Sequence, residues 1–71
     1  MEKNEIKKEL YKQNPIAEFQ YIRKGSAHYR TSVNDNNQHT HAVLFEVPVS
    51  DMGDADFGTT MEAKLLQRWI S

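Results

Sequence analysis

Apolar residues recur along this chain at different spacings, and each spacing predicts one kind of element. Near the start, Ile6 and Leu10 lie four positions apart, which is the spacing of one face of a helix. Asn4 can cap this helix, because its side chain can accept a hydrogen bond from the first turn. Asn14 precedes Pro15 and so avoids the helical region of backbone conformation. The pattern predicts a short N-terminal helix that ends at Asn14.

The middle of the chain alternates between apolar and polar residues, as strands with one buried face do. The alternation runs through residues 16–23, 27–33 and 41–49. Between the first two strands, Gly25 can adopt the positive φ of a tight turn, which predicts a hairpin. The polar run 34–40 is expected to be an exposed loop. Pro48 lacks an N–H, so the third strand is predicted to lie at an edge of the sheet.

The alternation also predicts which side chains of each strand face the core. The residues expected on the inner face are Ala17, Phe19, Tyr21, Tyr29, Thr31, Val33, Val43, Phe45, Val47 and Val49. Those expected on the outer face are Ile16, Glu18, Ile22, Leu44 and Glu46. The outer face is therefore expected to be partly apolar.

Residues 59–71 return to a helical spacing. Their apolar side chains form a broad stripe made up of Met61, Leu65, Leu66, Trp69 and Ile70. Trp69 is expected in the core, and the alternative is a surface position that anchors a partner. Together the elements predict one small α+β domain, residues 1–71. It is a three-stranded antiparallel β-meander with an N-terminal and a C-terminal helix packed on one face (α-β-β-β-α).

The stretch "DMGDADFGTTME", residues 51–62, resembles a metal loop in composition. An EF-hand calcium loop carries oxygen ligands at its first, third and fifth positions, a glycine at the sixth and a glutamate at the twelfth. Counted from Asp51, Glu62 stands at the twelfth position, but the third and fifth positions are Gly53 and Ala55. Two ligands and the turn glycine are missing, so calcium binding is not predicted.

The same stretch is better explained as the entrance to the C-terminal helix. Thr59 and Glu62 have the spacing of a capping box. Asp54 and Asp56 are expected near the positive end of the helix dipole, which stabilises each charge by up to about 1 kcal/mol. The alternative is an acidic loop, residues 51–56, that binds a partner.

His39 and His41 form a His-x-His pair, which can chelate zinc or nickel when it lies on a strand. A zinc site needs about three or four ligands, and the chain has no cysteine and no carboxylate cluster nearby in sequence. His28 can join the pair only if the fold brings it near. We therefore predict no metal site and no cofactor, with both histidines at the loop edge in solvent.

Ser26 and His28 are the one nucleophile–base pair that is local in sequence, and they fall at the predicted hairpin turn. A chain of 71 residues has little room for a pocket that excludes water. The sequence therefore predicts that the protein is not an enzyme and has no catalytic residues.

The charges are distributed unevenly along the chain. Residues 1–30 hold seven Lys/Arg and four Glu, giving +3, whereas residues 31–71 hold two Lys/Arg and six Asp/Glu, giving −4. These opposite charges can meet within one fold or between two copies, and the alternative is a solvated surface. No stretch approaches the roughly 20 apolar residues that span a bilayer, and no signal peptide is visible. We expect a cytoplasmic protein of bacterial type, with no membrane contact.

The order α-β-β-β-α, with "KGSAH" at residues 24–28 between the first two strands, resembles the double-stranded-RNA-binding domains. The resemblance covers most of the chain and implies binding of duplex RNA. That family grips phosphates with a lysine-rich start of its last helix, but here the matching stretch is "FGTTMEAK", preceded by "DMGDAD". Carboxylates at this position repel phosphates, so the sequence departs from the family where contact with RNA needs positive charge.

We therefore expect a non-enzymatic protein-interaction module that binds a protein partner or a second copy of itself. The residues expected to bind the partner are Ile16, Ile22, Leu44 and Trp69. The alternative function is nucleic-acid binding through a basic patch made up of Lys7, Lys8, Arg23, Lys24 and Arg30.

Overall fold

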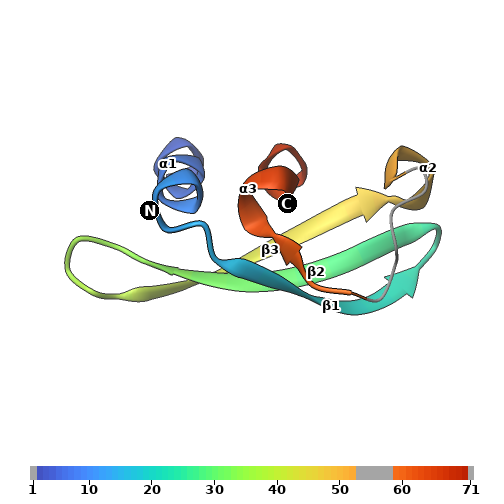
Figure 1. The fold of residues 1–71 in the computed structure, drawn as a ribbon, viewed down its shortest axis with the longest axis horizontal. Helices are drawn as coiled ribbons and strands as arrows, with labels where there is room; N and C mark the ends of the chain where they lie inside the picture. The colour runs from blue at the N-terminus through green and yellow to red at the C-terminus, as the bar shows by residue number, and fades with distance from the viewer. Residues whose placement is uncertain (1, 53–58, 71) are drawn as a thin grey trace.

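Three long strands and one very short strand form a single antiparallel sheet, and the helices lie on one side of it (Figure 1). The computed structural model describes residues 2–52 and 59–70. Along the chain the elements are α1 (Lys3–Gln13), β1 (Ile16–Arg23), β2 (Ser26–Asn34), β3 (Thr40–Pro48), α2 (Val49–Met52), β4 (Met61–Glu62), α3 (Ala63–Leu66) and the 3₁₀ helix η1 (Gln67–Trp69). The predicted α+β fold, a meander with helices on one face, is confirmed. The strand order is β3-β2-β1-β4, so β3 lies at an edge as predicted, and β4 and α2 are additions.

Helix α1 begins one residue before its predicted cap. Glu2 occupies the N-cap position without a side-chain hydrogen bond, and Asn4 lies inside the helix, so the prediction that Asn4 caps α1 is wrong. At the other end, Asn14 has a left-handed conformation with φ 44° and donates its backbone N–H into the last turn at 2.8 Å. Asparagine tolerates this conformation better than most residues. The helix therefore ends before Pro15, as predicted.

A two-residue turn joins β1 to β2. Lys24 and Gly25 both have positive φ, 51° and 76°, and they lie between the paired residues Arg23 and Ser26. Two consecutive positive φ values are the mark of a type I′ turn, whose twist matches that of the strands it connects. Gly25 adopts positive φ as predicted, whereas Lys24 does so at a steric cost because it carries a Cβ.

One extra residue in β1 shifts the pairing between β1 and β2. Phe19 pairs with Tyr29, but Tyr21 pairs with His28, so two residues of β1 span one step of β2. Gln20 is the additional residue and forms a β-bulge. After the bulge, each side chain of β1 points to the face opposite to the one that simple alternation predicts.

The bulge overturns two predictions for β1. Tyr21 is predicted on the core face, but it lies on the outer face and is 51% exposed. Ile22 is predicted on the outer face, but it pairs with the buried Ala27 and so points to the helix side. At this end of the hairpin Ile22 nevertheless remains half exposed.

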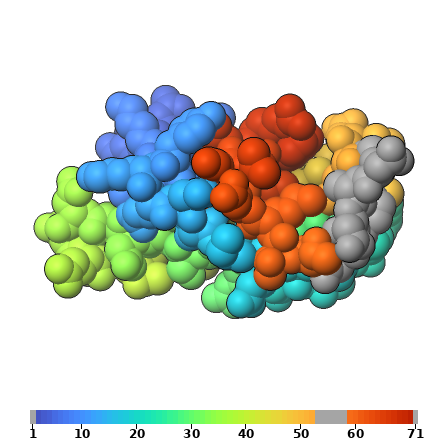
Figure 2. Space-filling view, viewed as in Figure 1, coloured from blue at the N-terminus to red at the C-terminus, as the bar shows by residue number. Residues whose placement is uncertain are grey.

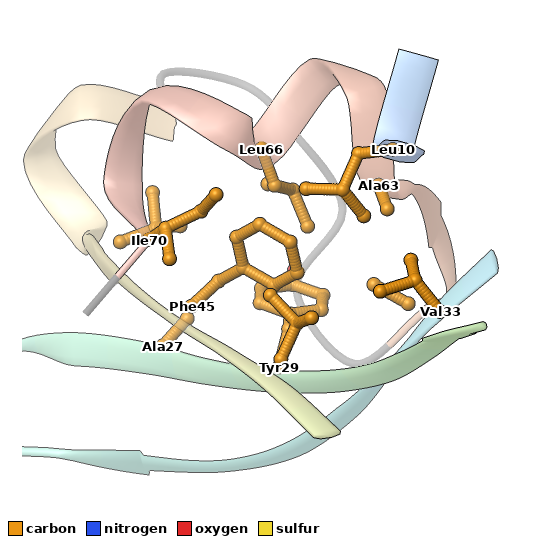
Figure 3. Packing of buried hydrophobic residues seen from close by; sticks show 11 residues of the cluster. Leu10, Ala27, Tyr29, Val33, Phe45, Ala63, Leu66 and Ile70 are labelled. Carbon is orange, nitrogen blue, oxygen red and sulfur yellow. The ribbon is translucent and has the colours of Figure 1, made fainter. Parts of the chain in front are cut away.

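The core lies between the sheet and the helices (Figure 3). Its buried apolar residues are Leu10, Ala17, Ala27, Tyr29, Val33, Val43, Phe45, Val47, Ala63, Leu66 and Ile70. The rings of Phe19 and Tyr29 meet edge to face with their centroids 5.7 Å apart. Thr31 is also buried, and its hydroxyl donates to the backbone oxygen of Ile16 at 2.9 Å. The predicted inner faces of β2 and β3 are confirmed, except that Val49 begins α2.

The side chain of Gln13 ties the end of α1 to β2. Its amide nitrogen donates to the backbone oxygen of Asn34 at 2.7 Å, and its amide oxygen accepts from the backbone N–H of Asn34 at 3.3 Å. In the register of β1 and β2, these backbone groups face the place that β1 would occupy if it began earlier. Gln13 therefore substitutes for a strand partner and fixes α1 over the sheet.

The C-terminal segment begins as a strand, which makes the predicted capping box wrong. Met61 and Glu62 pair with the start of β1, and the backbone N–H of Ala63 donates to the oxygen of Pro15 at 2.9 Å. The helix starts only at Ala63, and Glu62 at its N-cap position makes no side-chain cap bond. The carboxylate of Glu62 instead accepts a hydrogen bond from Asn14 at 3.4 Å.

The late helix start also changes which residues of this segment are buried. Ala63, Leu66 and Ile70 face the core, whereas Leu65, predicted in the apolar stripe, is 60% exposed. The segment lies directly beside α1, as Figure 2 shows in orange to red next to blue. Met61 and Trp69 pack against the core but are only partly buried. None of the described helices is long and apolar enough to cross a membrane.

Candidate functional site

The helices cover one side of the sheet and leave the opposite side of β1, β2 and β3 open (Figure 1). Side chains of these three strands point to the open side. The strand pairing arranges them in two rows, Glu18–Arg30–Leu44 and Tyr21–His28–Glu46. Ile16 precedes Glu18 by two residues on β1 and shares its face. We call this surface the open face, made up of Ile16, Glu18, Tyr21, His28, Arg30, Leu44 and Glu46. The helices that the structure describes leave it uncovered.

Three large apolar side chains of the open face are about half exposed. Ile16 and Leu44 are each 54% exposed, and Tyr21 is 51% exposed. Full burial of a side chain of this kind stabilises by about 1.5–3 kcal/mol relative to exposure. Single exposed apolar residues are normal on a protein surface, but these three lie on one side of a small sheet. Covering this side with a partner is therefore favourable.

The aromatic part of the open face is a product of the β-bulge. The rings of Tyr21 and His28 stack with their centroids 4.6 Å apart and their planes at 18°. If β1 alternated regularly through Gln20, without a bulge, Tyr21 would share the face of Phe19 and point to the helix side. The stack restricts the Tyr21 ring before any partner arrives, which lowers the entropy that binding must remove.

Charges of both signs lie between the apolar side chains. Arg30 stands opposite Glu18 in the register of β1 and β2, and Glu46 stands opposite His28 in the register of β2 and β3. Within residues 2–52 and 59–70, the ion pairs involve Asp35 with two histidines and Glu62 with a lysine, and none involves these three side chains. The charges of the open face are therefore free to meet opposite charges on a partner.

The structure brings two of the four predicted partner-binding residues together. Ile16 and Leu44 lie on the open face, but Ile22 points to the other side of the sheet. Trp69 lies on the helix side, where it packs partly against the core and has the guanidinium of Arg68 above its ring, 3.8 Å from the centroid. The arrangement of Trp69 is closer to the predicted core position than to a surface anchor.

The predicted basic residues do not gather in one patch. Lys7 and Lys8 lie on α1, on the helix side of the sheet. Arg23 and Lys24 lie at the β1–β2 turn, at the other end of the molecule in Figure 1. Arg30 lies on the open face beside Glu18. A contiguous basic surface for nucleic acid is therefore absent from this set of residues.

Two of the three histidines meet at a carboxylate that sequence reasoning missed. Oδ2 of Asp35 lies 2.9 Å from Nε2 of His41 and 3.7 Å from Nδ1 of His39, whereas His28 lies on the open face. Asp35 stands at the start of the polar loop, where aspartate often bonds the backbone of a turn, and this signal could have identified it. In the described part of the chain, no three His, Cys, Asp or Glu side chains are arranged to hold a metal ion.

The acidic stretch that opened the question of calcium is only partly described. Asp51 lies in α2, and Glu62 lies in β4 with its carboxylate bonded to Asn14. The roles predicted for Asp54 and Asp56 fall outside the described residues.

Comparison of the chain with protein-family models, with curated proteins and with solved structures finds no match. Its function is therefore inferred from the open face itself.

Proposed function

We propose that this protein is a non-enzymatic interaction module that binds a second copy of itself through the open face. One observation carries the proposal: half-exposed apolar side chains and unpaired charges of both signs share one uncovered side of the sheet. Burial of the apolar side chains supplies the free energy of association. The charges select a partner with opposite signs at matching positions.

A second copy of the chain has such a charge pattern. Arg30 lies centrally on the open face with Glu18 on one neighbouring strand and Glu46 on the other. In a two-fold dimer, each copy presents the same surface to the other. The Arg30 of each copy can then lie against a carboxylate of its partner, while the Leu44 side chains are buried.

Sedimentation equilibrium over a wide range of concentrations tests this dimer. We expect the apparent mass to rise from monomer towards dimer for the natural chain, and to stay monomeric for Leu44→Glu. Leu65→Glu is the matched control, because Leu65 is also a leucine, is 60% exposed and lies on the helix side. The control should associate like the natural chain. A natural chain that stays monomeric at the highest concentration, or a Leu44→Glu variant that still dimerises, would contradict the proposal.

Charge reversal tests the pairing itself. Arg30→Glu makes the charged positions of the open face uniformly acidic, and the double variant Glu18→Arg/Glu46→Arg makes them uniformly basic. Each variant alone should associate more weakly than the natural chain, because like charges oppose each other. An equimolar mixture should form a heterodimer that weakens as salt is added. A mixture that remains monomeric would show that these charges do not face each other.

Nucleic-acid binding stays a prediction with its own test. Its candidate residues, Lys7, Lys8, Arg23, Lys24 and Arg30, lie on different parts of the molecule. Titration with duplex RNA at low salt, followed by NMR, would favour it if resonances shift in a salt-dependent way. Unchanged spectra would exclude it.

A further inference from the structure

The backbone groups of β3 alternate between the sheet and its outer edge. The N–H of Asp35 donates to the oxygen of His39 at 2.9 Å, and the N–H of Val49 donates to the oxygen of Gly25 at 2.9 Å. Both bonds continue the β2–β3 register beyond its two ends. In an antiparallel pair, bonded and non-bonded positions alternate, so the odd-numbered residues of β3 bond to β2. The even-numbered residues Thr40, Ala42, Leu44 and Glu46 direct both N–H and C=O to the outer edge, and Pro48 directs only its C=O.

The chain covers the middle of this edge with its own C-terminal segment. Ile70 forms an antiparallel bridge with Phe45. Because Phe45 directs its own backbone groups to Tyr29 of β2, the bridge occupies the edge beside Leu44 and Glu46. A strand edge with unpaired backbone groups can pair with a further strand. The bridge covers the middle of the β3 edge and so prevents such pairing there.

The side chain of Ile70 holds the bridge in place. It is only 9% exposed and belongs to the core cluster beside Phe45 and Leu66 (Figure 3). The backbone N–H of Ile70 donates to the oxygen of Gln67, the first residue of η1, at 3.3 Å, which ties Ile70 to this helix. At one end of the edge, Pro48 has no N–H to offer a strand. Ala42 and Thr40 remain at the other end.

We propose that the bridge between Ile70 and Phe45 blocks the outer edge of β3. When Ile70 detaches, a second copy of this chain can pair its own β3 with this edge. The sequence of β3 supports such self-pairing in an antiparallel register centred on Leu44. Leu44 then opposes Leu44 of the second copy, and Ala42 opposes Glu46 of the second copy, so no like charges face each other. In this register the outward N–H groups of Ala42 and Glu46 each meet a carbonyl of the second copy. This inference concerns the edge of the sheet and does not rest on a dimer through the open face.

A test of the proposal weakens the contact of Ile70 with the core without burying a charge. Ile70→Ser removes the apolar anchor, and Val33→Ala is the control, because Val33 is 1% exposed on β2 and away from this edge. Sedimentation velocity should show concentration-dependent association of Ile70→Ser beyond that of the natural chain, and no such increase for Val33→Ala. Adding Ala42→Pro should abolish the increase, because it removes an outward N–H that β2 does not use. A folded Ile70→Ser variant that sediments like the natural chain, or an equal increase for Val33→Ala, would overturn the proposal.

Hydrogen exchange of the natural chain tests whether the Ile70 bridge covers the β3 edge, even if Ile70→Ser does not fold. The amide of Glu46 lies under the bridge, whereas the outward amide of Ala42 lies beyond it. We expect the Glu46 amide to exchange at least about tenfold more slowly than the Ala42 amide after correction for intrinsic rates. Equal exchange at the two amides would mean that the bridge does not cover the edge, and would overturn the proposal.

Discussion

The carboxylate oxygen Oδ2 of Asp35 lies 2.9 Å from Nε2 of His41, so one side chain closes the loop between β2 and β3. Its other oxygen, Oδ1, accepts hydrogen bonds from the backbone N–H groups of Asn37 at 2.8 Å and His39 at 2.9 Å. These bonds favour the charged form of the carboxyl group. The bond to His41 and then the backbone bond from His39 lower the pKa of Asp35 from 3.8 to about 2.

The lowered pKa of Asp35 predicts how the loop responds to acid. A carboxyl group whose pKa is lower in the folded chain stabilises that chain above its unfolded pKa, and this stabilisation is lost as the pH falls through the folded value. We expect the loop to keep its hydrogen bonds above pH 3.8 and to lose them as the pH falls through about 2. Carbon-detected NMR of the Asp35 carboxyl group should give a midpoint of about 2.

The control for this titration is Asp35→Asn. Its amide cannot gain a negative charge, so the protection of the Asn37 and His39 amides, after correction for intrinsic exchange rates, should no longer change in this acid range, whereas it should fall in the natural chain. A midpoint near 3.8 in the natural chain would contradict the prediction, because it would mean that the bonds to Asp35 do not favour its charged form.

The double hydrogen bond of Gln13 predicts a measurable loss of stability on truncation. Gln13→Ala leaves the backbone N–H and C=O of Asn34 without this partner. Each of the two hydrogen bonds contributes about 0.5–1.5 kcal/mol, so we expect a loss of roughly 1–3 kcal/mol in the free energy of unfolding by urea. Gln13→Glu should recover only part of it, because a carboxylate accepts from the N–H but cannot donate to the carbonyl.

Lys12→Ala is the matched control for Gln13. Lys12 is an exposed neighbour on the same helix, and no hydrogen bond or ion pair joins its side chain to the rest of the described chain. Its truncation should change the stability by less than about 0.5 kcal/mol. Equal effects of the two truncations would show that the contact with Asn34 does not hold α1.

The type I′ turn predicts opposite effects of substitution at its two positions. Gly25 has φ 76°, and a Cβ added there would meet nothing within 4 Å, so Gly25→Ala carries only the cost of the left-handed backbone. We expect it to lower the stability by about 1–2 kcal/mol. Lys24→Gly should instead raise the stability or leave it unchanged, because glycine relieves the same cost at φ 51°. Thermal unfolding of both variants tests the pair, and a stabilising Gly25→Ala would contradict it.

The sequence predicted the burial of side chains correctly in those strands where apolar and polar residues alternate along the whole strand. The inner positions of β2 and β3 alternate without interruption from Tyr29 to Val33 and from Val43 to Val47, and they are buried as predicted. The ends of the first helix and the turn at Gly25 rest on local backbone chemistry, and there Asn14 and Gly25 behaved as expected. Asn4 did not become the cap, since helix termini depend on backbone contacts that a motif of single residues does not fix.

The bulge in β1 could have been predicted from the sequence. Counting outward from the two-residue turn, simple pairing places Phe19 opposite Arg30. That would set an apolar side chain of the inner face against a charge of the outer face. One extra residue between Phe19 and the turn removes the conflict, and Gln20 is that residue. Tyr21 therefore reached the open face for a reason that register counting could have supplied.

The C-terminal segment could not be derived in the same way, because its conformation depends on distant partners. Its spacing suits a helix from Thr59 onward, yet pairing of Met61 and Glu62 with the start of β1 delays the helix to Ala63. Tertiary pairing thus overrode local propensity. The contact of Asp35 with His41 was missed for a similar reason, since it exists only when the loop closes, although the turn position of Asp35 itself could be read from the sequence.

Leu10 carries the contact between the two ends of the chain, and its truncation should be among the most damaging changes. It is the buried residue of α1 and lies beside Ala63 and Leu66 of α3 (Figure 3). Leu→Ala substitutions in cores cost about 2–5 kcal/mol. At about 0.05–0.15 kcal/mol per residue, a chain of 71 residues has a total stability of roughly 4–11 kcal/mol. We therefore expect Leu10→Ala to remove a large share of the stability.

Urea unfolding followed by the fluorescence of Trp69 measures this loss, because Trp69 packs partly against the same core. Ile6→Ala is the control, since Ile6 lies one turn earlier on α1 and is only partly buried. It should cost clearly less than Leu10→Ala. Equal costs would mean that α1 is held by its whole apolar stripe, and a negligible cost for Leu10→Ala would mean that the sheet and the C-terminal segment form a stable unit without it.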